Sequence, residues 1–416
     1  MISSRDIVLV SSVEWGFLWQ IPQEVSLRLT RAGNRVLYVE NTGVRSPSLG
    51  DAGRVAQRFR RWADSLPSRR ARCAAPGVYV VSPLVLPPFG PPQRHLANRF
   101  LLRLQVAGAS RRLGMRDPII WTFLPTDTSA EIVCLLASPR SVVVYHCTAG
   151  FSRLTPRAAE LVRSEEASLK MSDVVFANCT GLSDICRRWN DNVSVLPPGV
   201  DLGAFLPGSR GRGADAPAPA GGGEGGEPRR PVIGYVGGLH RHVDYELLAG
   251  MARARPEWSW LFVGPRQTEV NGLGSLPNVR MLGQQPHRDL VHYIREMDVC
   301  LVPYLNNPET ETVMPVKLND YLAVGKPIVS TPVPALREFN ERHGVIFTAD
   351  ASTDSFLSTI EAALATSADE RLVARRREVA ALSDWQTRLS AMSDLIEGAA
   401  LRKSAESGGR SVAAEA

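Results

Sequence analysis

The sequence predicts an α/β protein of two Rossmann-like domains, each built on a parallel sheet, that face each other across a cleft. Three observations predict this class. Strand-like and helix-like periods alternate along most of the 416 residues, which is typical of parallel sheets covered on both faces. The alternation stops at residues 207–230 and then restarts. The length suffices for two or three domains of roughly 150 residues each.

The first domain is expected over residues 1–206. It opens with the strand "DIVLVSS", an amphipathic helix in "IPQEVSLRLTRAG" that should end at Gly33, and the strand "NRVLYVE". The later elements are expected in the order strand "GVYVVSP", helix "QRHLANRFLLRLQVAGASRRLG", strands "PIIWTF" and "SVVVYHC", helix "PRAAELVRSEEASLKMS", strand "DVVFANC", helix "TGLSDICRRW" and strand "NVSVLPPGVD".

The second domain is expected over residues 231–370, after a flexible linker at 207–230. The linker consists of Gly, Pro and Ala with scattered charge, and so it has little to bury. The alternation then resumes with strand "VIGYVGG", helix "DYELLAGMARARP", strands "SWLFVGP" and "VRMLG", helix "HRDLVHYIREM", strand "DVCLVP", a helix within "MPVKLNDYLAVG", and strands "PIVST" and "GVIFT".

The C-terminal tail is expected to be helical over residues 371–403, with apolar residues at helical spacing after Trp385. Because it follows a completed sheet, we expect it to pack back on the first domain. Residues 404–416 are small and polar, which predicts a disordered tail.

Composition limits the classes of function. The cysteines lie without C-x-x-C pairs or histidines at ligand spacing, which predicts reduced thiols and no structural metal. The opening apolar run is bracketed by Asp6 and Glu14, and no window reaches the roughly 20 apolar residues of a membrane-spanning helix. We therefore expect a cytoplasmic protein. The six cysteines are Cys73, Cys134, Cys147, Cys179, Cys186 and Cys300.

The net charge of +6 is unevenly spread. Residues 54–72 contain seven arginines against a single acidic residue, Asp64. This stretch fits a solvated basic surface, an anionic acceptor, or peripheral contact with the anionic inner face of the plasma membrane. A nucleic-acid partner is not expected, because the stretch has few interleaved aromatics and no nucleic-acid module accompanies it.

A charged pair opens one helix of the second domain. In "VMPVKLNDYLAVGKP", Pro315 suits the first helical position and Gly325 the helix end. Lys317 then lies in the first turn, where the helix macrodipole disfavours a cation by about 0.3–1 kcal/mol unless an anion is close. Asp320 shares its face at i+3. The pair fits a pyrophosphate held by the lysine and a ribose held by the carboxylate, or a surface ion pair of small energy.

A glycine turn follows the first strand of the same domain. In "GYVGGLHRHVD", Gly237 and Gly238 let a ligand approach the backbone, with His240, Arg241 and His242 as candidate phosphate contacts. The pattern is not G-x-G-x-x-G, and the next strand ends in Gly264 and Pro265 instead of an acidic residue. A dinucleotide-dependent oxidoreductase is therefore disfavoured.

Taken together, these stretches resemble a known family. "PVIGYVGGL", "LPNVRMLGQQPHRDLVHYIREMDVCLVPY" and "MPVKLNDYLAVGKPIVST" are similar to the donor-binding half of GT-B glycosyltransferases of the family 4 type. "WGFLWQIPQEVSLRLTRAGNRVLYVE", "VVYHCTAGFS" and "VLPPGVDLGAF" are similar to N-terminal landmarks of that family. The resemblance covers nearly the whole chain outside the linker and tail, and is strongest to bacterial teichuronic-acid and exopolysaccharide glycosyltransferases.

The resemblance implies a donor site in the second domain. Family members place two carboxylates eight positions apart, one on the donor sugar and one on the ribose. Asp320 matches the ribose position, whereas the sugar position falls on Thr312, with Glu311 beside it and Glu309 near; whether Glu311 or Thr312 substitutes is open. The family's phosphate cations fall on Gly238 and the His242 region. The expected donor contacts are Gly237, Gly238, Arg241, Arg266, Lys317 and Asp320.

The resemblance also implies an acceptor side in the first domain, at Trp15, Gly16 and His146. The expected catalytic residues are Glu311, Lys317 and His146. The expected reaction moves a sugar, with retention, from a UDP- or GDP-sugar to a saccharide or lipid-linked acceptor in cell-surface polysaccharide synthesis. No further cofactor is expected, and the absence of D-x-D fits a reaction without metal. The alternatives are a natural-product tailoring enzyme, a sugar-nucleotide epimerase and a non-catalytic binding protein.

Overall fold

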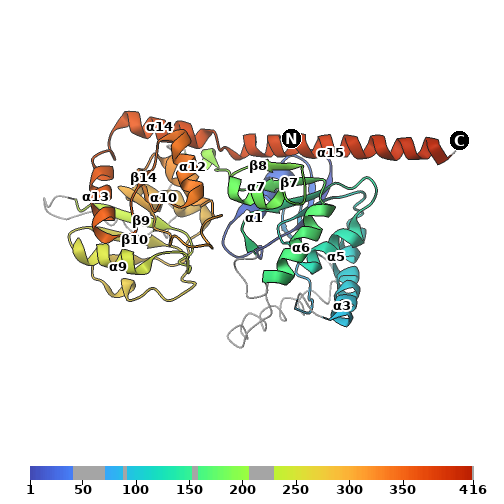
Figure 1. Ribbon diagram of the computed structural model, residues 1–416, viewed down its shortest axis with the longest axis horizontal. Coiled ribbons are helices and arrows are strands. Elements are labelled where there is room, and N and C mark those ends of the chain that lie inside the picture. Colours follow the sequence, from blue (N-terminus) through green and yellow to red (C-terminus); the bar gives the residue numbers. More distant parts are fainter. Residues whose placement is uncertain (41–70, 88–90, 152–157, 206–228, 415–416) are drawn as a thin grey trace. The chain divides into compact units, whose positions relative to one another are not determined.

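The computed structural model describes residues 1–40, 71–87, 91–151, 158–205 and 229–414, with side chains as far as residue 406. Most of the basic stretch at 54–72 lies outside these residues, as does the predicted linker apart from its last two residues. The described chain forms two compact units (Figure 1). Unit 1 comprises Met1–Leu196 and Leu389–Ala416, and unit 2 comprises Pro197–Arg388.

Unit 1 is built on an eight-stranded sheet of order β3-β4-β2-β1-β5-β6-β7-β8. All neighbouring strands are parallel except β3 and β4, which pair antiparallel. The antiparallel edge strand β3 is absent from the sequence prediction. The strands are β1 (Asp6–Val10), β2 (Arg35–Val39), β3 (Arg72–Ala75), β4 (Val78–Val81), β5 (Ile119–Thr122), β6 (Val143–Cys147), β7 (Val174–Ala177) and β8 (Val193–Val195).

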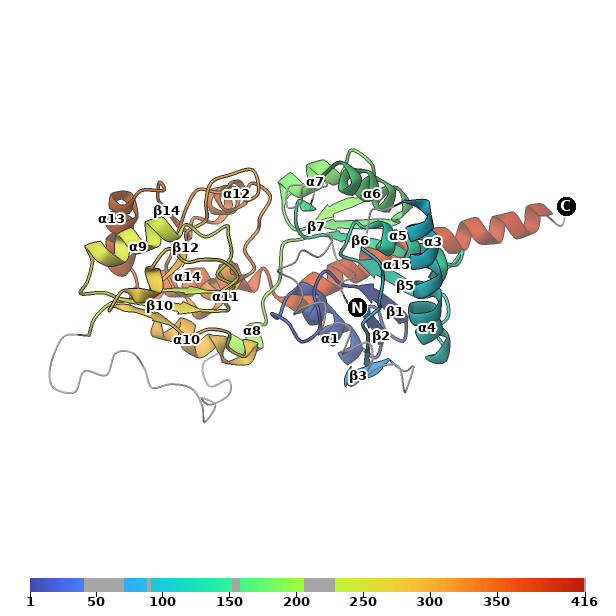
Figure 2. The ribbon, with the colours of Figure 1, turned by 90° about the horizontal axis from the view of Figure 1, so that it is seen from below.

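The helices of unit 1 alternate with its strands, and they include α5, which is absent from the sequence prediction. The single helix expected over residues 93–114 is three joined segments, with one π-helical stretch, η2, between α3 and α4. In Figure 2, α3, α4 and α5 lie at one side of this sheet. The helices are α1 (Ile21–Arg31), α3 (Pro92–Leu102), η2 (Arg103–Ala107), α4 (Gly108–Arg112), α5 (Asp127–Leu136), α6 (Ala158–Met171), α7 (Thr180–Cys186) and α15 (Trp385–Ala414).

Unit 2 is built on a six-stranded, fully parallel sheet of order β11-β10-β9-β12-β13-β14. Helices α9 and α13 pack together on one face, and α10, α11 and α14 on the other (Figure 2). The strands are β9 (Val232–Val236), β10 (Ser259–Val263), β11 (Val279–Met281), β12 (Val299–Val302), β13 (Ile328–Ser330) and β14 (Phe347–Thr348). The helices are α8 (Leu202–Phe205), α9 (Tyr245–Ala254), η4 (Leu273–Ser275), η5 (His287–Asp289), α10 (Leu290–Glu296), α11 (Lys317–Val324), α12 (Pro334–His343), α13 (Thr353–Leu364) and α14 (Glu370–Ala381).

The first boundary between the units lies at residue 196, ten residues before the predicted end of the first domain. Hydrogen bonds hold the intervening segment to unit 2. Asn319 Nδ2 donates to the Pro198 carbonyl at 2.8 Å, and Arg295 Nη2 donates to the Phe205 carbonyl at 3.2 Å. No apolar periodicity marks these contacts in the sequence.

The C-terminal helices divide between the units. α14 belongs to unit 2, whereas α15 joins unit 1 from Leu389 onward. Within unit 1, Ser393 Oγ accepts from the Ile2 amide at 3.0 Å, and Lys403 Nζ lies 2.6 Å from Asp173 Oδ2. Ile2 precedes β1 and Asp173 precedes β7, so α15 runs along the amino ends of these strands. The carboxyl ends of the strands lie at the opposite edge of the sheet.

Residues 404–414, for which the sequence predicts a disordered tail, continue α15 as a helix that ends at Ala414. Each further residue of a helix adds a backbone hydrogen bond without needing a core. The low hydrophobicity of these residues removes the apolar pattern that predicts packing, but it does not prevent a helix. None of the helices in the described part of the chain combines the length and the apolar composition needed to cross a bilayer.

The first residue of α15 should stabilise unit 2. The Trp385 side chain is 4% exposed, its amide donates to the Val200 carbonyl at 3.1 Å, and its ring fills the space where a Cβ on Gly199 would stand. We expect Trp385→Ala to lower the free energy of unfolding by about 3–5 kcal/mol, measured by urea denaturation. Trp189→Ala is the control, since that side chain is 42% exposed. Equal losses in the two variants would contradict this packing.

Candidate functional site

The carboxyl edge of the unit 2 sheet carries the predicted donor residues. The strand order reverses between β9 and β12, and in open parallel sheets ligands bind beyond the carboxyl ends of the strands at such a point. β9 is followed at once by Gly237 and Gly238, and the segment after β12 leads into α11. The strand order therefore brings two of the predicted motifs to one edge.

Gly237 and Lys317 lie in direct contact at this edge. Gly237 has φ +133°, and a Cβ built on it would stand 2.7 Å from Lys317 Nζ. Gly264, at the end of β10, has φ +149°, and a Cβ there would stand 1.9 Å from the Gly237 carbonyl oxygen. Residues other than glycine rarely adopt such positive φ angles. Both glycines are therefore required. Gly237 leaves room for the Lys317 side chain at the end of β9, and Gly264 lets the end of β10 approach the Gly237 backbone.

The Lys317 ammonium is enclosed by tyrosines. Its Nζ lies 3.6 Å from the centre of the Tyr235 ring and donates to the Tyr304 hydroxyl at 3.2 Å. Burial lowers the Lys317 pKa well below its usual 10.5, and the nearby Asp320 carboxylate acts in the opposite direction. The Lys317 ammonium is thus poorly solvated, and the cation–π contact and one hydrogen bond stabilise its charged form.

The lysine is the first residue of α11, which ends at Gly325 in the left-handed conformation (φ +88°). The sequence predicted this C-terminus, and the helix begins two residues after the predicted Pro315. Asp320 follows in the first turn and is partly buried. A lysine at a helix N-terminus opposes the macrodipole. An anion placed there would interact favourably with both the ammonium and the free amide groups of the first turn.

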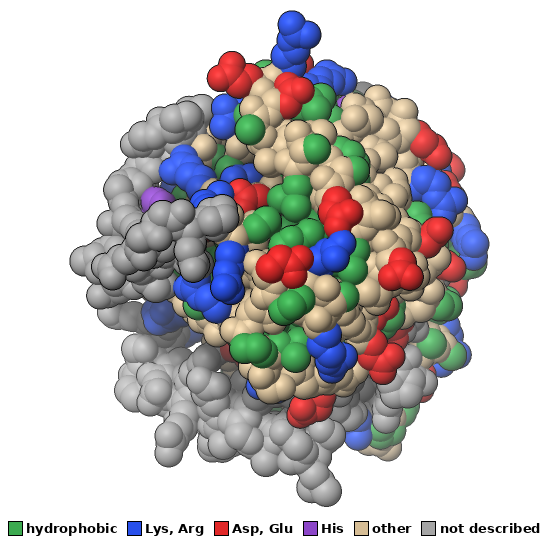
Figure 3. Space-filling model, turned by 90° about the vertical axis from the view of Figure 1, so that its left-hand side faces the viewer, with side chains coloured by type: hydrophobic (Ala, Val, Ile, Leu, Met, Phe, Trp, Pro, Cys, Tyr) green, Lys and Arg blue, Asp and Glu red, His purple; other side chains and the backbone are tan. Residues whose placement is uncertain are grey.

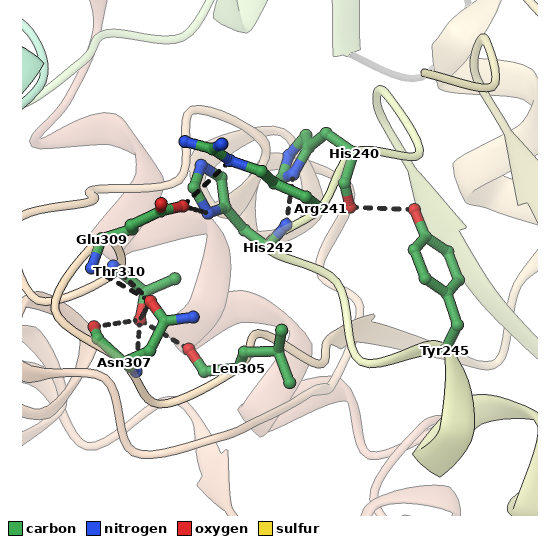
Figure 4. Close-up of polar contacts among 8 residues, drawn as sticks. All are labelled: His240, Arg241, His242, Tyr245, Leu305, Asn307, Glu309 and Thr310. Carbon is green, nitrogen blue, oxygen red and sulfur yellow. Dashed lines mark hydrogen bonds and ion pairs between the residues drawn. The ribbon is translucent and has the colours of Figure 1, made fainter. Parts of the chain in front are cut away.

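The turn after Gly238 is tied to the segment after β12 by one carboxylate (Figure 4). Glu309 Oε2 lies 3.0 Å from Arg241 Nε and 3.3 Å from His242 Nδ1. The backbones are joined as well, since the Leu305 amide donates to the His242 carbonyl at 2.8 Å. The guanidinium predicted for phosphate contact is therefore neutralised within the protein by Glu309.

The two histidines of this turn are neutral at pH 7. The pKa of His240 is lowered to about 3, chiefly by burial and then by electrostatic interaction with Lys317, His242 and Arg241. The pKa of His242 is also lowered, by burial first, although Glu309 opposes this effect. Neutral imidazoles offer hydrogen bonds to an anion but no net charge. Lys317 and Arg241 are consequently the cations that this edge supplies.

The other predicted donor residues lie further out. Arg266 pairs by its backbone with Leu239 beside the turn, while its side chain is 55% exposed and lies 3.8 Å from Glu269. Glu311 is exposed, whereas Thr312 is only 4% exposed. Glu309, which sequence reasoning named only as a neighbour of Thr312, is the carboxylate that points to the glycine turn (Figure 4).

Sequence reasoning missed the tyrosines. Tyr235 lies inside β9 and also donates from its hydroxyl to the Gly238 carbonyl at 3.0 Å, while Tyr304 follows β12. Burial raises the pKa of Tyr304 to about 12, so the hydroxyl stays protonated beside the lysine. One signal could have identified these tyrosines. Each lies at the carboxyl end of one of the two strands between which the strand order reverses.

The predicted acceptor residue Trp15 follows β1 in unit 1. Its amide donates to Glu40 Oε1 at 2.9 Å, and its ring meets Tyr38 edge-on at 5.0 Å between centres. Gly16 is exposed, and a Cβ there would meet nothing within 4 Å. Glu40, at the end of β2, thus orients the loop that carries Trp15. A side chain at position 16 would meet no steric obstacle.

The second predicted acceptor residue, His146, is enclosed. It lies in β6, is 1% exposed, and its ring stacks on Phe123 at 4.9 Å between centres and meets Phe176 edge-on. Its Nε2 lies 3.1 Å from Asn178 Oδ1. Burial lowers its pKa to about 4. This packing supports a neutral structural histidine and does not support contact with a substrate.

No group of three or more His, Cys, Asp or Glu side chains with the geometry of a metal site occurs in the part of the chain that the structure describes. The six cysteines are free thiols, and four of them are buried. The described chemistry at the unit 2 edge is thus that of an anion site: an ammonium, a helix N-terminus and close backbone approach.

The burial of Lys317 should appear in the pH dependence of stability. Its folded pKa is lowered, so between that value and 10.5 the unfolded chain binds a proton that the folded chain lacks. Stability of the wild type should therefore rise with pH through this window relative to Lys317→Met, and the variant should be the more stable below it. Chemical denaturation across pH 7–10.5 measures the difference. Lys170→Met, with a side chain 55% exposed, is the matched control, and parallel curves for wild type and Lys317→Met would refute the account.

Comparison with known proteins finds a matching family model for the part of the chain that carries this site. Residues 230–366 match the family model described as glycosyl transferases group 1. A putative teichuronic acid biosynthesis glycosyltransferase of Bacillus subtilis, TuaH, is 31% identical over 158 residues. That similarity spans 37% of this chain and 40% of the relative's length.

Solved structures resemble nearly the whole chain. Sucrose-phosphate synthase from Thermosynechococcus elongatus matches with a TM-score of 0.67 and 18% identity, covering 95% of this chain and 98% of that one. The Anabaena protein HepE in complex with UDP matches with a TM-score of 0.63 and 14% identity, covering 95% and 100%. At these identities the likeness shows the fold alone, which is the two-domain GT-B fold. Within that fold, the match to the glycosyl transferases group 1 model covers residues 230–366.

Proposed function

We propose that this protein is a glycosyltransferase that moves a sugar from a nucleotide-sugar donor to a saccharide or lipid-linked acceptor in cell-surface polysaccharide synthesis. The observation that carries the proposal is the Lys317 ammonium, held against the Gly237 backbone where the strand order of unit 2 reverses. A desolvated cation at a helix N-terminus suits the pyrophosphate of such a donor.

A UDP-sugar is the donor we favour over a GDP-sugar, with no further cofactor. Structures of HepE, which shares the fold, were obtained in complex with UDP and with UDP-glucose. Cell-surface polysaccharide is favoured because the printed name of the relative TuaH refers to teichuronic acid biosynthesis. The cytoplasm, where nucleotide sugars are made, is the expected site of action.

In the proposed reaction the bond between the sugar C1 and the phosphate oxygen breaks, and the acceptor oxygen bonds to C1 on the same face. Lys317 and the first turn of α11 stabilise the charge that develops on the departing phosphate. That phosphate oxygen takes the acceptor's proton. The scheme assigns no base role to His146, in keeping with its burial and its low pKa. Asp320 is placed on the ribose, one helical turn from Lys317.

A non-catalytic binding protein is the second candidate, because the position that bears the sugar-contacting carboxylate in the family holds Thr312. Such a protein would keep the donor site and lack turnover. Nucleotide binding and sugar transfer must therefore be measured separately.

Nucleotide binding should depend on Lys317. We expect UDP to raise the melting temperature of the wild type more than GDP, dTDP or NAD do, and Lys317→Ala to weaken UDP binding at least tenfold by removing a charge-assisted contact. Calorimetric titration with UDP measures the loss, and Lys170→Ala is the control. Release of UDP from UDP-sugars in the presence of a lipid-linked acceptor mixture separates the two candidates. Unchanged affinity in Lys317→Ala would remove this lysine from the donor site.

Glu309 and Glu311 should differ in their effect on the donor. The Glu309 carboxylate would compete with the donor phosphates for Arg241, and its negative charge would repel them. We therefore expect Glu309→Gln to tighten UDP binding by roughly two- to tenfold, given a charge effect on the order of 1 kcal/mol near the surface. Glu311→Gln, which alters an exposed carboxylate beside it, should change the affinity by less than about twofold. Weaker UDP binding in Glu309→Gln would instead mean that Glu309 positions Arg241 for the donor.

A further inference from the structure

Helix α3 of unit 1 turns a second apolar stripe outward. Leu96, Phe100 and Leu104, the last in η2, are 67%, 63% and 56% exposed. Their spacing of four residues places them on one face of the helix. Exposed large apolar side chains scattered singly are ordinary, whereas a row of three on one element marks an interaction surface. We call this row, with Arg99 and Arg103 beside it, the α3 face.

The opposite side of the same segment already serves the core. Leu102 and Val106 are 0% and 1% exposed and pack with strands β1 and β2. Asn98 holds the preceding loop by accepting from the Leu86 amide at 2.8 Å. A surface helix normally buries one stripe and solvates the rest. The outward stripe is thus largely exposed in the described part of unit 1.

The charge within residues 92–112 has one sign. Residues 92–112 contain five arginines and no aspartate or glutamate. Acidic groups of α5 reach the helix at its sides, where Arg99 Nε lies 3.2 Å from Glu131 and His95 Nδ1 lies 3.2 Å from Asp127. On the face drawn in Figure 3, by comparison, acidic and basic side chains both occur, with hydrophobic ones between them.

The nature of the charge decides what can cover the α3 face. An arginine-rich segment would be repelled by charge of the same sign. A second copy would bring its own arginines opposite these. A nucleic acid would satisfy the arginines but leave the leucines and the phenylalanine in water. An anionic bilayer satisfies both, because apolar side chains enter the acyl boundary while arginines reach the headgroups.

We propose that the α3 face is the surface by which this protein lies on an anionic membrane. Leu96, Phe100 and Leu104 enter the interface, and Arg99 and Arg103 lie level with the lipid phosphates. The inference goes beyond the proposed transfer reaction, since lipid binding requires no donor. It would also hold the enzyme beside a lipid-linked acceptor.

Vesicle co-sedimentation of the full chain tests the proposal. We expect binding to vesicles of equal parts phosphatidylglycerol and phosphatidylcholine, and at least tenfold weaker binding to phosphatidylcholine alone. Phe100→Ser/Leu104→Ser should weaken binding to the anionic vesicles at least tenfold by removing buried apolar area. Arg99→Gln/Arg103→Gln should weaken it by a similar factor and flatten its salt dependence.

Leu372→Ser/Leu382→Ser is the matched control, because it removes two exposed leucines from unit 2 (38% and 59% exposed). It should bind vesicles as the wild type does. No vesicle binding by the wild type, or equal losses in control and α3 variants, would overturn the proposal. UDP titration of the same variants should match the wild type, so a failed donor site and a failed membrane surface are told apart.

Discussion

The contact between the Lys317 ammonium and the Gly237 backbone is the constraint on which the site depends. The lysine reaches the end of β9 only because residue 237 lacks a Cβ, and Tyr235 and Tyr304 then form its walls. Each of these residues comes from β9, from the end of β12 or from the first turn of α11. The parallel register of β9 and β12 therefore sets the geometry of the site.

The charges around this contact are balanced so that an anion is favoured. Glu309 neutralises Arg241, and Asp320 partly supports the lysine charge. Burial nevertheless lowers the Lys317 pKa, which means that these groups do not fully replace the solvent the ammonium has lost. A phosphate at the N-terminus of α11 would supply the missing interaction. Binding and stability are thereby opposed at one residue, as is common at functional sites.

Much of this organisation could be predicted from the sequence, and the failures have physical causes. Local periodicity located the strands, and Gly237, Lys317 and Asp320 were named because each breaks or fulfils a local rule. Tyr235 contacts Lys317 across 82 residues of sequence and Glu309 contacts Arg241 across 68. Local rules carry no information on such contacts. His146 was named for its position at a strand end, but the direction of its side chain, into the aromatic core, depends on packing. The end of the first unit was misplaced because hydrogen bonds, not apolar residues, fix that segment.

The most direct test of the account is the pKa of Lys317 with and without UDP. The chain has only four lysines, so ¹³C-labelled lysine side chains give few NMR signals, and Lys317→Met assigns the one of interest. The account predicts a pKa well below 10.5 in the free protein, because of burial, and a clear rise when UDP binds. A signal that titrates near 10.5 and does not move with UDP would contradict it.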